Sequence, residues 1–192
     1  MEEATAPRGL KIWDMATQHL PFTTSLPDAF NSLIGLIMVR WGYLELRLQQ
    51  LVFMTLRVNE PQGRLAVKNL RAMEMVELAV DLMLLEGVHI EIEGLSQLKE
   101  IESRRNLLAH GVWHHDATSD TYILRDLTGA WRAEAKGGAK VKRKILPAGV
   151  PITVHNLEDL AGALEGAVRD AEEVGRVIQQ QRAARAATAN HP

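Results

Sequence analysis

The chain has 192 residues, of which 46% are hydrophobic and 24% charged, so it is long and apolar enough to bury the core of a globular domain. The formal net charge of -2 excludes a protein coated with basic residues, and any contact with nucleic acid has to come from a local basic patch. Because cysteine is absent, disulfides and thiolate chemistry are excluded, which fits the reducing cytoplasm that we expect as its location.

The first part of the chain predicts a flexible arm followed by a long helix. Residues 1–24 contain two prolines, scattered charge and no sustained period, which is typical of a flexible arm. From Asp28 to about Val58, apolar residues recur at alternating spacings of four and three, which predicts one stripe on a helix. The stripe consists of Ile34, Met38, Trp41, Leu48 and Val52. Glu45 occupies the one charged position of this stripe. Other charged and amide residues interrupt the apolar stretch around it, which predicts that the stretch does not enter a membrane.

Two further helices are predicted before residue 111. Asn59 as the N-cap, with Pro61 in the first turn, predicts a helix that runs to Leu85 and ends at Gly87. A third helix is expected from about Ile92 to Ala109 or His110. Its apolar stripe consists of Leu98, Ile101, Leu108 and Val112, with the charged residue Arg105 in the middle.

The pattern changes after Gly111. Residues 112–116 and 121–127 predict two short strands joined by a four-residue turn, which together form a hairpin. The segment 131–144 has two central glycines and predicts an exposed loop or an irregular edge strand. Asn156, with Asp159 three residues later, resembles a capping box at the start of a last long helix, and the final dozen residues are expected to fray. The seam of this helix consists of Leu160, Leu164, Ala167, Ala171, Val174 and Ile178.

The expected fold class is mainly α, an up-and-down bundle of four long helices with a small β-hairpin between the third and the last helix. We expect a single domain over residues 25–184, with the hairpin insertion at about 111–150 and a flexible tail over 185–192.

Glu45 and Arg105 interrupt two apolar stripes at equivalent central positions. A buried charge that has lost its water needs a partner, and these two side chains have opposite signs. The sequence therefore predicts that they meet as an ion pair, with Glu102, one helical turn before Arg105, as the competing partner. Such a pair can simply stabilise the bundle without any catalytic meaning.

The functional hypothesis comes from the segment Arg105-Asn106-Leu107-Leu108-Ala109-His110. An arginine, a polar residue, a short gap and a histidine resemble the signature of HEPN domains, which are helical bundles that include many metal-independent ribonucleases. The following Gly111, Val112 and Trp113, with the hairpin, look like an uncharacterised bacterial branch of that group. The resemblance covers about Leu98 to His115, and it implies a toxin or phage-defence setting with RNA and an antitoxin or neighbouring protein as partners.

The resemblance implies a cleavage that uses neither a metal nor another cofactor. His110 can accept the proton of the ribose 2′-hydroxyl, because imidazole titrates near neutral pH. Arg105 can stabilise the charge that develops on the phosphate, and Asn106 can hold a phosphate oxygen or the imidazole. The expected products are a 2′,3′-cyclic phosphate and a 5′-hydroxyl.

Helical geometry limits this hypothesis. Residues five apart on an ideal helix point about 140° from each other, so Arg105 and His110 do not share a face. They converge if the helix unwinds at residues 109–111 or if a second subunit completes the site, as the resemblance implies, which makes a homodimer part of the hypothesis. Gly35 and Gly42, seven residues apart, allow the close approach of a neighbouring helix, although a contact within the chain explains them equally well.

Three alternatives stay open beside the ribonuclease. His110, His114, His115 and Asp116 suggest a zinc site, but Gly111 is expected to end the helix and to separate the histidines. A basic run can follow an RNA backbone or can be a solvated loop, and it consists of Arg132, Lys136, Lys140, Lys142, Arg143 and Lys144. The competing function is a non-catalytic helical dimerisation or interaction module in which Arg105 stabilises the core.

Overall fold

A computed structural model describes residues 22–85, 87, 93–126, 130–136, 139–145 and 148–189. Contacts between residues divide this part of the chain into two compact units. One unit is helical and contains residues 31–105 together with the chain from 157 onward. The other contains the β-strands and consists of the described residues up to 30 and of 106–156. The boundaries of the single domain expected above stay a prediction.

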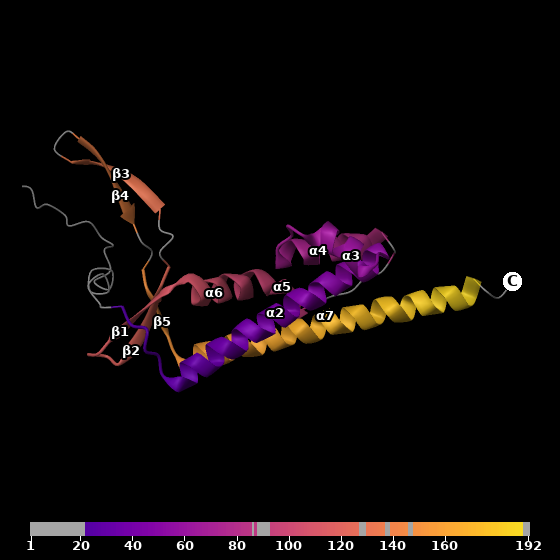
Figure 1. Ribbon diagram of the computed structural model, residues 1–192, viewed down its shortest axis with the longest axis horizontal. Helices are drawn as coiled ribbons and strands as arrows, with labels where there is room; N and C mark the ends of the chain where they lie inside the picture. The colour runs from indigo at the N-terminus through magenta and orange to yellow at the C-terminus, as the bar shows by residue number, and fades with distance from the viewer. Residues whose placement is uncertain are drawn as a thin grey trace, which may run out of the picture. The chain divides into compact units, whose positions relative to one another are not determined.

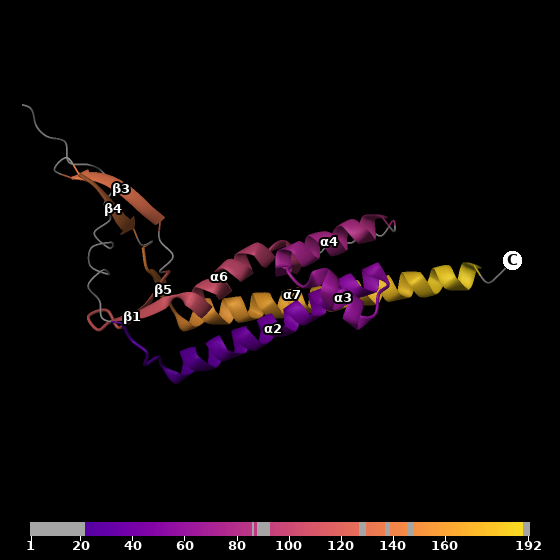
Figure 2. The same ribbon diagram turned by 45° about the horizontal axis from the view of Figure 1, so that its top comes forward.

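The helical unit is built around two long helices, α2 (Asp28–Leu56) and α7 (Val154–Ala189), which lie side by side in Figure 1 and Figure 2. α3 (Glu60–Val67), α4 (Ala72–Leu85), α5 (Glu93–Ser96) and α6 (Leu98–His110) complete the set of helices in the described residues. All six residues of the predicted α7 seam are buried, so this seam is confirmed. None of these helices combines the length and apolar character that crossing a lipid bilayer requires.

The buried face of α2 differs from the predicted stripe. Its centre is formed by Ile37, Leu44 and Leu51, whereas the predicted Ile34 and Met38 are only half-buried. The other three residues of the predicted stripe, Trp41, Leu48 and Val52, are buried as expected, so the prediction is wrong only in its first part. Spacing alone could not separate the predicted stripe from the buried face, because α2 carries apolar residues on most of its circumference.

Each of the two helices predicted between Asn59 and His110 is divided in the structure. Asn59 caps α3 as predicted, and its side chain accepts a hydrogen bond from the backbone nitrogen of Gln62 at 3.1 Å. α4 then starts anew at Ala72, because the carboxylate of Glu74 accepts a hydrogen bond from the Arg71 backbone at 2.7 Å, half of a capping box. Gly87 lies just beyond the end of α4 with a φ of 70°, as expected for a terminating glycine.

The carboxyl end of α2 is closed by two arginines. Arg57 has a φ of 58° and donates its backbone hydrogen to Met54 O, while the next residue, Val58, reaches back to Phe53 O at 3.2 Å. This is a Schellman motif with arginine at the position that glycine usually occupies. From α7, the guanidinium of Arg182 donates to the carbonyl oxygens of Met54 and Thr55.

The β-unit contains a three-stranded antiparallel sheet in the order β1 (Val112–Asp116), β2 (Thr121–Arg125) and β5 (Val150–Ile152). β1 has its predicted bounds, and β2 begins at the predicted residue but ends at Arg125; in this hairpin Trp113 lies opposite Leu124 and His115 opposite Tyr122. The third strand was not predicted. Phe22 forms an isolated bridge to His114 and the backbone nitrogen of Thr23 donates to Trp113 O, so these two residues lie along the outer edge of β1.

The segment predicted as a loop or irregular edge strand forms a second hairpin instead. β3 (Ala130–Lys136) pairs with β4 (Ala139–Ile145) in an antiparallel register that sets Arg132 opposite Arg143. Gly137 and Gly138, which suggested irregular structure, lie outside the described residues.

The structure corrects the capping prediction that was made for Asn156 at the start of α7. Thr153 precedes the helix, and its hydroxyl accepts a hydrogen bond from the Asn156 backbone at 3.2 Å. The Asn156 side chain returns the contact by accepting from the Thr153 backbone at 2.9 Å. Asn156 is therefore the third residue of the helix and not its cap. At the other end, α7 continues to Ala189, because alanine, arginine and glutamine favour a helix where fraying was expected.

Candidate functional site

The Arg-Asn-x3-His segment lies at the carboxyl end of α6. The helix continues through Ala109 and His110, and the backbone nitrogen of Gly111 still donates to Leu107 O at 2.8 Å. The unwinding at residues 109–111 that would have brought Arg105 and His110 together is therefore not present. His110 is the last residue of α6 and is exposed, and the half-buried Asn106 lies one turn before it on the same face.

Gly111 allows the chain to turn from α6 into β1. A Cβ atom at this position would lie 2.5 Å from Leu107 O and 2.7 Å from Leu124 Cδ1, closer than real contacts permit. The glycine was expected to end the helix, and the structure adds a reason from packing: the backbone passes directly against β2. Any larger side chain would displace the end of α6 that carries His110.

The guanidinium of Arg105 lies over an aromatic ring. Its central carbon is 5.3 Å from the centre of the Trp41 ring, within the distance of a cation–π contact. Trp41 belongs to the buried face of α2 and Arg105 is half-buried. A structural role for Arg105 was one of the alternatives, but its aromatic partner was not predicted.

The predicted ion pair of Glu45 and Arg105 is not among the ion pairs of the described residues. Glu45 is only half-buried, so burial does not force it to pair. The arginines of α2 pair with α7 instead: Arg40 lies 2.8 Å from Glu165 and Arg47 lies 3.0 Å from Glu172. Glu102, the competing partner, is half-buried on α6.

Two polar residues of the sheet are buried, of which His114 was considered only as a zinc ligand and Arg125 was not considered. His114 is 3% exposed and Arg125 is 5% exposed, and the His114 ring lies 4.9 Å from the Phe22 ring. In the register of β1 and β2, His114 is opposite Ile123, two residues from Arg125, so the two polar residues are diagonal neighbours on one sheet face. The strand alternation could have indicated this shared face, but not its burial.

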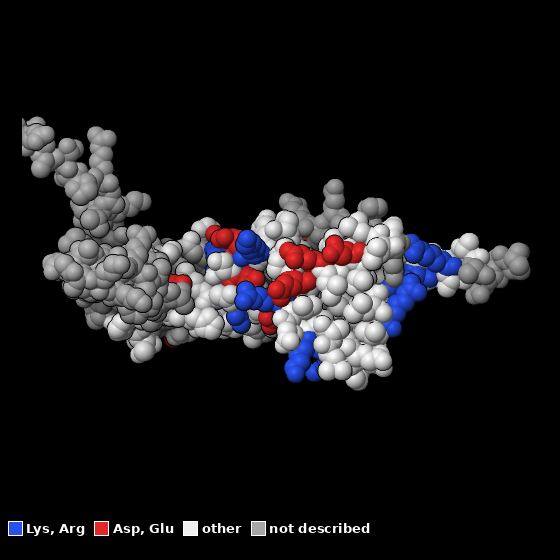
Figure 3. Space-filling model, turned by 90° about the horizontal axis from the view of Figure 1, so that it is seen from above, with Lys and Arg blue, Asp and Glu red and all other residues white. Residues whose placement is uncertain are grey.

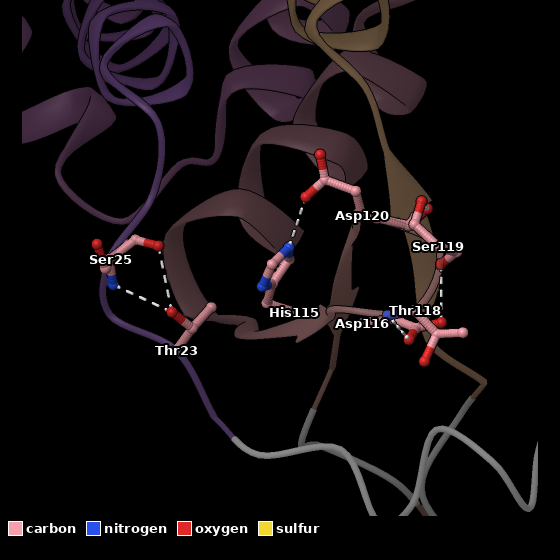
Figure 4. Close-up of polar contacts among 8 residues, drawn as sticks. Thr23, Ser25, His115, Asp116, Thr118, Ser119 and Asp120 are labelled. Carbon is pink, nitrogen blue, oxygen red and sulfur yellow. Dashed lines mark hydrogen bonds and ion pairs between the residues drawn. The ribbon is translucent and has the colours of Figure 1, made fainter.

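The exposed end of the β1–β2 hairpin holds an ordered imidazole. His115 Nε2 lies 2.9 Å from Asp120 Oδ1, and the His115 ring stacks on Tyr122 with 4.6 Å between ring centres (Figure 4). Asp120 has a φ of 49°, in the left-handed region that aspartate tolerates in turns. This pair can hold the ring in one orientation.

Next to this pair, Asp116 closes the turn of the hairpin. Its carboxylate accepts hydrogen bonds from the Ser119 hydroxyl at 2.7 Å and from the Thr118 backbone at 3.0 Å. These bonds favour the charged form, the serine contributing most, and hold the pKa of Asp116 below its ordinary value of 3.8.

The described residues contain no ligand set for the zinc site that was considered as an alternative. His114 and His115 are consecutive in β1, so their side chains point to opposite faces of the sheet. In the part of the chain that the structure describes, no group of three or more histidine, aspartate or glutamate side chains is placed to hold a metal ion.

The predicted RNA-binding residues belong to the second hairpin. Arg132 and Lys136 lie in β3, and Lys140, Lys142, Arg143 and Lys144 lie in β4. Their side chains are outside the described part of the structure. In the helical unit, basic side chains gather near the carboxyl end of α7 (Figure 3), where Arg182 and Arg185 line a depression with Arg57.

Comparison of the chain with protein-family models, with curated proteins and with solved structures finds no match.

Proposed function

We propose that this protein is an HEPN-like, metal-independent endoribonuclease. The observation that carries the proposal is the placement of the Arg-Asn-x3-His segment at the end of a helix, with the imidazole of His110 exposed and Asn106 one turn before it. An exposed imidazole next to a side-chain amide can take a proton from a ribose hydroxyl and hold a neighbouring oxygen.

In this proposal, His110 is the general base and Arg105 stabilises the phosphate charge. Asn106 positions either a phosphate oxygen or the imidazole. Arginine suits its role because the planar guanidinium offers two parallel hydrogen bonds to phosphate oxygens. The contact with the Trp41 ring fixes the position of the guanidinium itself, so phosphate binding requires this group to leave the ring.

The continuous helix has a consequence for the number of chains. Side chains five residues apart lie about 140° apart around the axis, so Arg105 and His110 of one α6 point in different directions. We therefore propose that a homodimer completes the cleavage site, with the arginine of one chain serving the imidazole of the other. A toxin or phage-defence setting with an antitoxin as partner belongs to the same proposal and rests on the resemblance alone.

The proposal is tested by incubating the purified full chain with mixed RNA in EDTA. Cleavage is expected without divalent metal, with 2′,3′-cyclic phosphate and 5′-hydroxyl ends. His110→Ala is expected to lower the cleavage rate by about 10²–10⁴-fold, the usual contribution of a general base. Arg105→Ala is expected to lower it by about 10²–10³-fold.

Matched variants separate catalysis from general damage. His155→Ala removes another exposed histidine, and Arg64→Ala removes an arginine that pairs with Glu60 on the surface. Both should cleave like the original chain, and circular dichroism should show that all four variants are folded. Equal cleavage by the original chain and both motif variants, or cleavage that requires added metal, would contradict the proposal.

The second candidate is a non-catalytic helical interaction module. The cation–π contact of Arg105 with Trp41 favours it, because such a contact stabilises the bundle whether or not RNA is bound. In that case Arg105→Ala lowers the free energy of unfolding by about 1 kcal/mol, and neither the original chain nor any variant cleaves RNA.

A further inference from the structure

The side of α2 that faces away from its buried residues carries a seven-residue repeat. Gly35, Val39, Gly42 and Leu46 follow one another at spacings of four, three and four, which places them within about 60° around the helix axis. The core residues Ile37, Leu44 and Leu48 lie on the opposite side. Figure 2 shows this helix along the lower edge of the helical unit, with α7 beside it.

This repeat is an exposed seam of alternating small and large residues. Val39 is 71% exposed and Leu46 is 44% exposed. A Cβ atom placed on Gly35 or Gly42 would meet nothing within 4 Å. The described chain therefore does not pack onto either glycine, which removes the contact within the chain that could have explained them.

The flanks of the seam add apolar surface and then polar ends. Leu36 and Tyr43 are both partly exposed and extend the apolar area on one side. Ser32 and Gln49 continue the same repeat at its two ends with a hydroxyl and an amide group. An apolar centre between polar ends is the arrangement of a specific protein interface.

The seam is complementary to itself when two copies of α2 run antiparallel. In one register, Val39 lies opposite Gly42 of the second copy and Leu46 lies opposite Gly35. The same register sets Ser32 opposite Gln49, so a hydroxyl meets an amide at both ends, and these two groups can hydrogen-bond to each other. A parallel pair in register would instead set glycine against glycine and valine against valine, leaving gaps beside crowded positions.

We propose that α2 packs antiparallel against α2 of a second copy of this chain, with Val39 and Leu46 filling the spaces above the two glycines. The proposal goes beyond RNA cleavage, because this pairing uses neither Arg105 nor His110. Its test is made without RNA. A Val39→Glu variant that becomes monomeric and still cleaves RNA would contradict the dimeric cleavage site alone, whereas a dimer that Val39→Glu leaves intact would contradict this pairing alone.

The first test is the mass in solution, measured by sedimentation over a range of concentrations. The original chain should approach twice 21.4 kDa as its concentration rises. Val39→Glu places two carboxylates in the seam and should give 21.4 kDa throughout. The matched control is Leu65→Glu on α3, because Leu65 is 75% exposed outside the seam, and this variant should still dimerise.

Gly42→Ala gives a sharper test because two opposite effects are expected. Alanine favours a helix over glycine, so the fold of the single chain should become more stable. The added methyl group fills the space that Val39 of the second copy occupies, so the dissociation constant should rise by about tenfold or more. A fully solvated α2 face predicts the stabilisation without any change in association.

Disulfide trapping tests the direction of the helices, since the chain has no cysteine of its own. A mixture of Ser32→Cys chains and Gln49→Cys chains should form a covalent dimer on oxidation. Either variant alone should not, because positions 32 of antiparallel helices lie about 25 Å apart in this register.

Three outcomes would overturn the proposal. One is a chain that stays monomeric at every concentration, and another is a dimer that Val39→Glu leaves intact. The third is self-linking of either single cysteine variant, which would indicate a parallel pair. A monomer that loses stability on Val39→Glu would assign the seam to another segment of the same chain.

Discussion

The carboxylate of Asp116 is held by the turn that it helps to form. Its pKa lies below the ordinary value because the Ser119 hydroxyl and the Thr118 backbone donate to the charged form. A group whose pKa is lower in the folded than in the unfolded chain stabilises the fold above the unfolded value. That contribution is lost as the pH falls through the folded pKa. Acid should therefore weaken this turn by protonating the Asp116 carboxylate.

Ser119→Ala should raise the pKa of Asp116 toward 3.8, since it removes the largest cause of the shift. The titration of the Asp116 carboxyl carbon, followed by NMR, measures the change directly. Thr118→Ala is the matched control, because the backbone hydrogen bond from Thr118 remains and only a minor contribution of its side chain is lost. An unchanged Asp116 titration in Ser119→Ala would show that the hydroxyl contributes nothing.

Individual residues were predictable where one local rule decided their structure. Asn59 caps α3 and Gly87 takes a positive φ at the end of α4, both as expected from residue type and position. Arg57 shows the limit of such rules, because arginine has no preference for the left-handed conformation that it adopts here. Its conformation follows from the Schellman hydrogen bonds at the end of α2.

At the scale of helices, the carboxyl end of α2 depends on a residue from α7. The last carbonyl groups of a helix have no partner within it, and they carry partial negative charge. The guanidinium of Arg182 supplies both hydrogen bonds and positive charge to the carbonyls of Met54 and Thr55. The contact therefore holds the carboxyl end of α2 against α7.

Arg182→Ala should lower the free energy of unfolding by about 1–2 kcal/mol, because charged hydrogen bonds to these carbonyls are lost. Chemical denaturation followed by circular dichroism measures the loss. Arg169→Ala, at an exposed position nearer the start of α7, should stay within about 0.5 kcal/mol of the original chain. Similar losses in both variants would mean that general charge, and not the cap, is responsible.

The positions of the long helices could be predicted because their apolar periods are strong, and the α7 seam was predicted residue by residue. The breaks at residues 68–71 and at Gln97 could not, because apolar spacing continues across them. β5 was not predicted, because three residues are too few to show a period. This strand is defined by its pairing with β2. Such pairing depends on the fold and not on local propensity.

For the whole chain, the sequence predicted a mainly helical protein with a small antiparallel β-element, and the structure agrees at that level. The four-helix count and the single hairpin were too simple. The candidate site was predictable as a motif on α6, but its geometry was not. The boundary between the two compact units falls between Arg105 and Asn106, so the two ends of the motif belong to different units. Spacing in one helix contains no information about such a division.

The contact of Arg105 with Trp41 gives the molecule an optical reporter. Indole emission responds to a nearby guanidinium, so a phosphate that draws Arg105 away from the ring should change the fluorescence of Trp41. The chain has four tryptophans, and replacing the other three by phenylalanine isolates this signal. Titration with a short oligonucleotide would then register occupancy at the arginine itself, in a variant whose His110 has been removed and whose ligand consequently stays uncut.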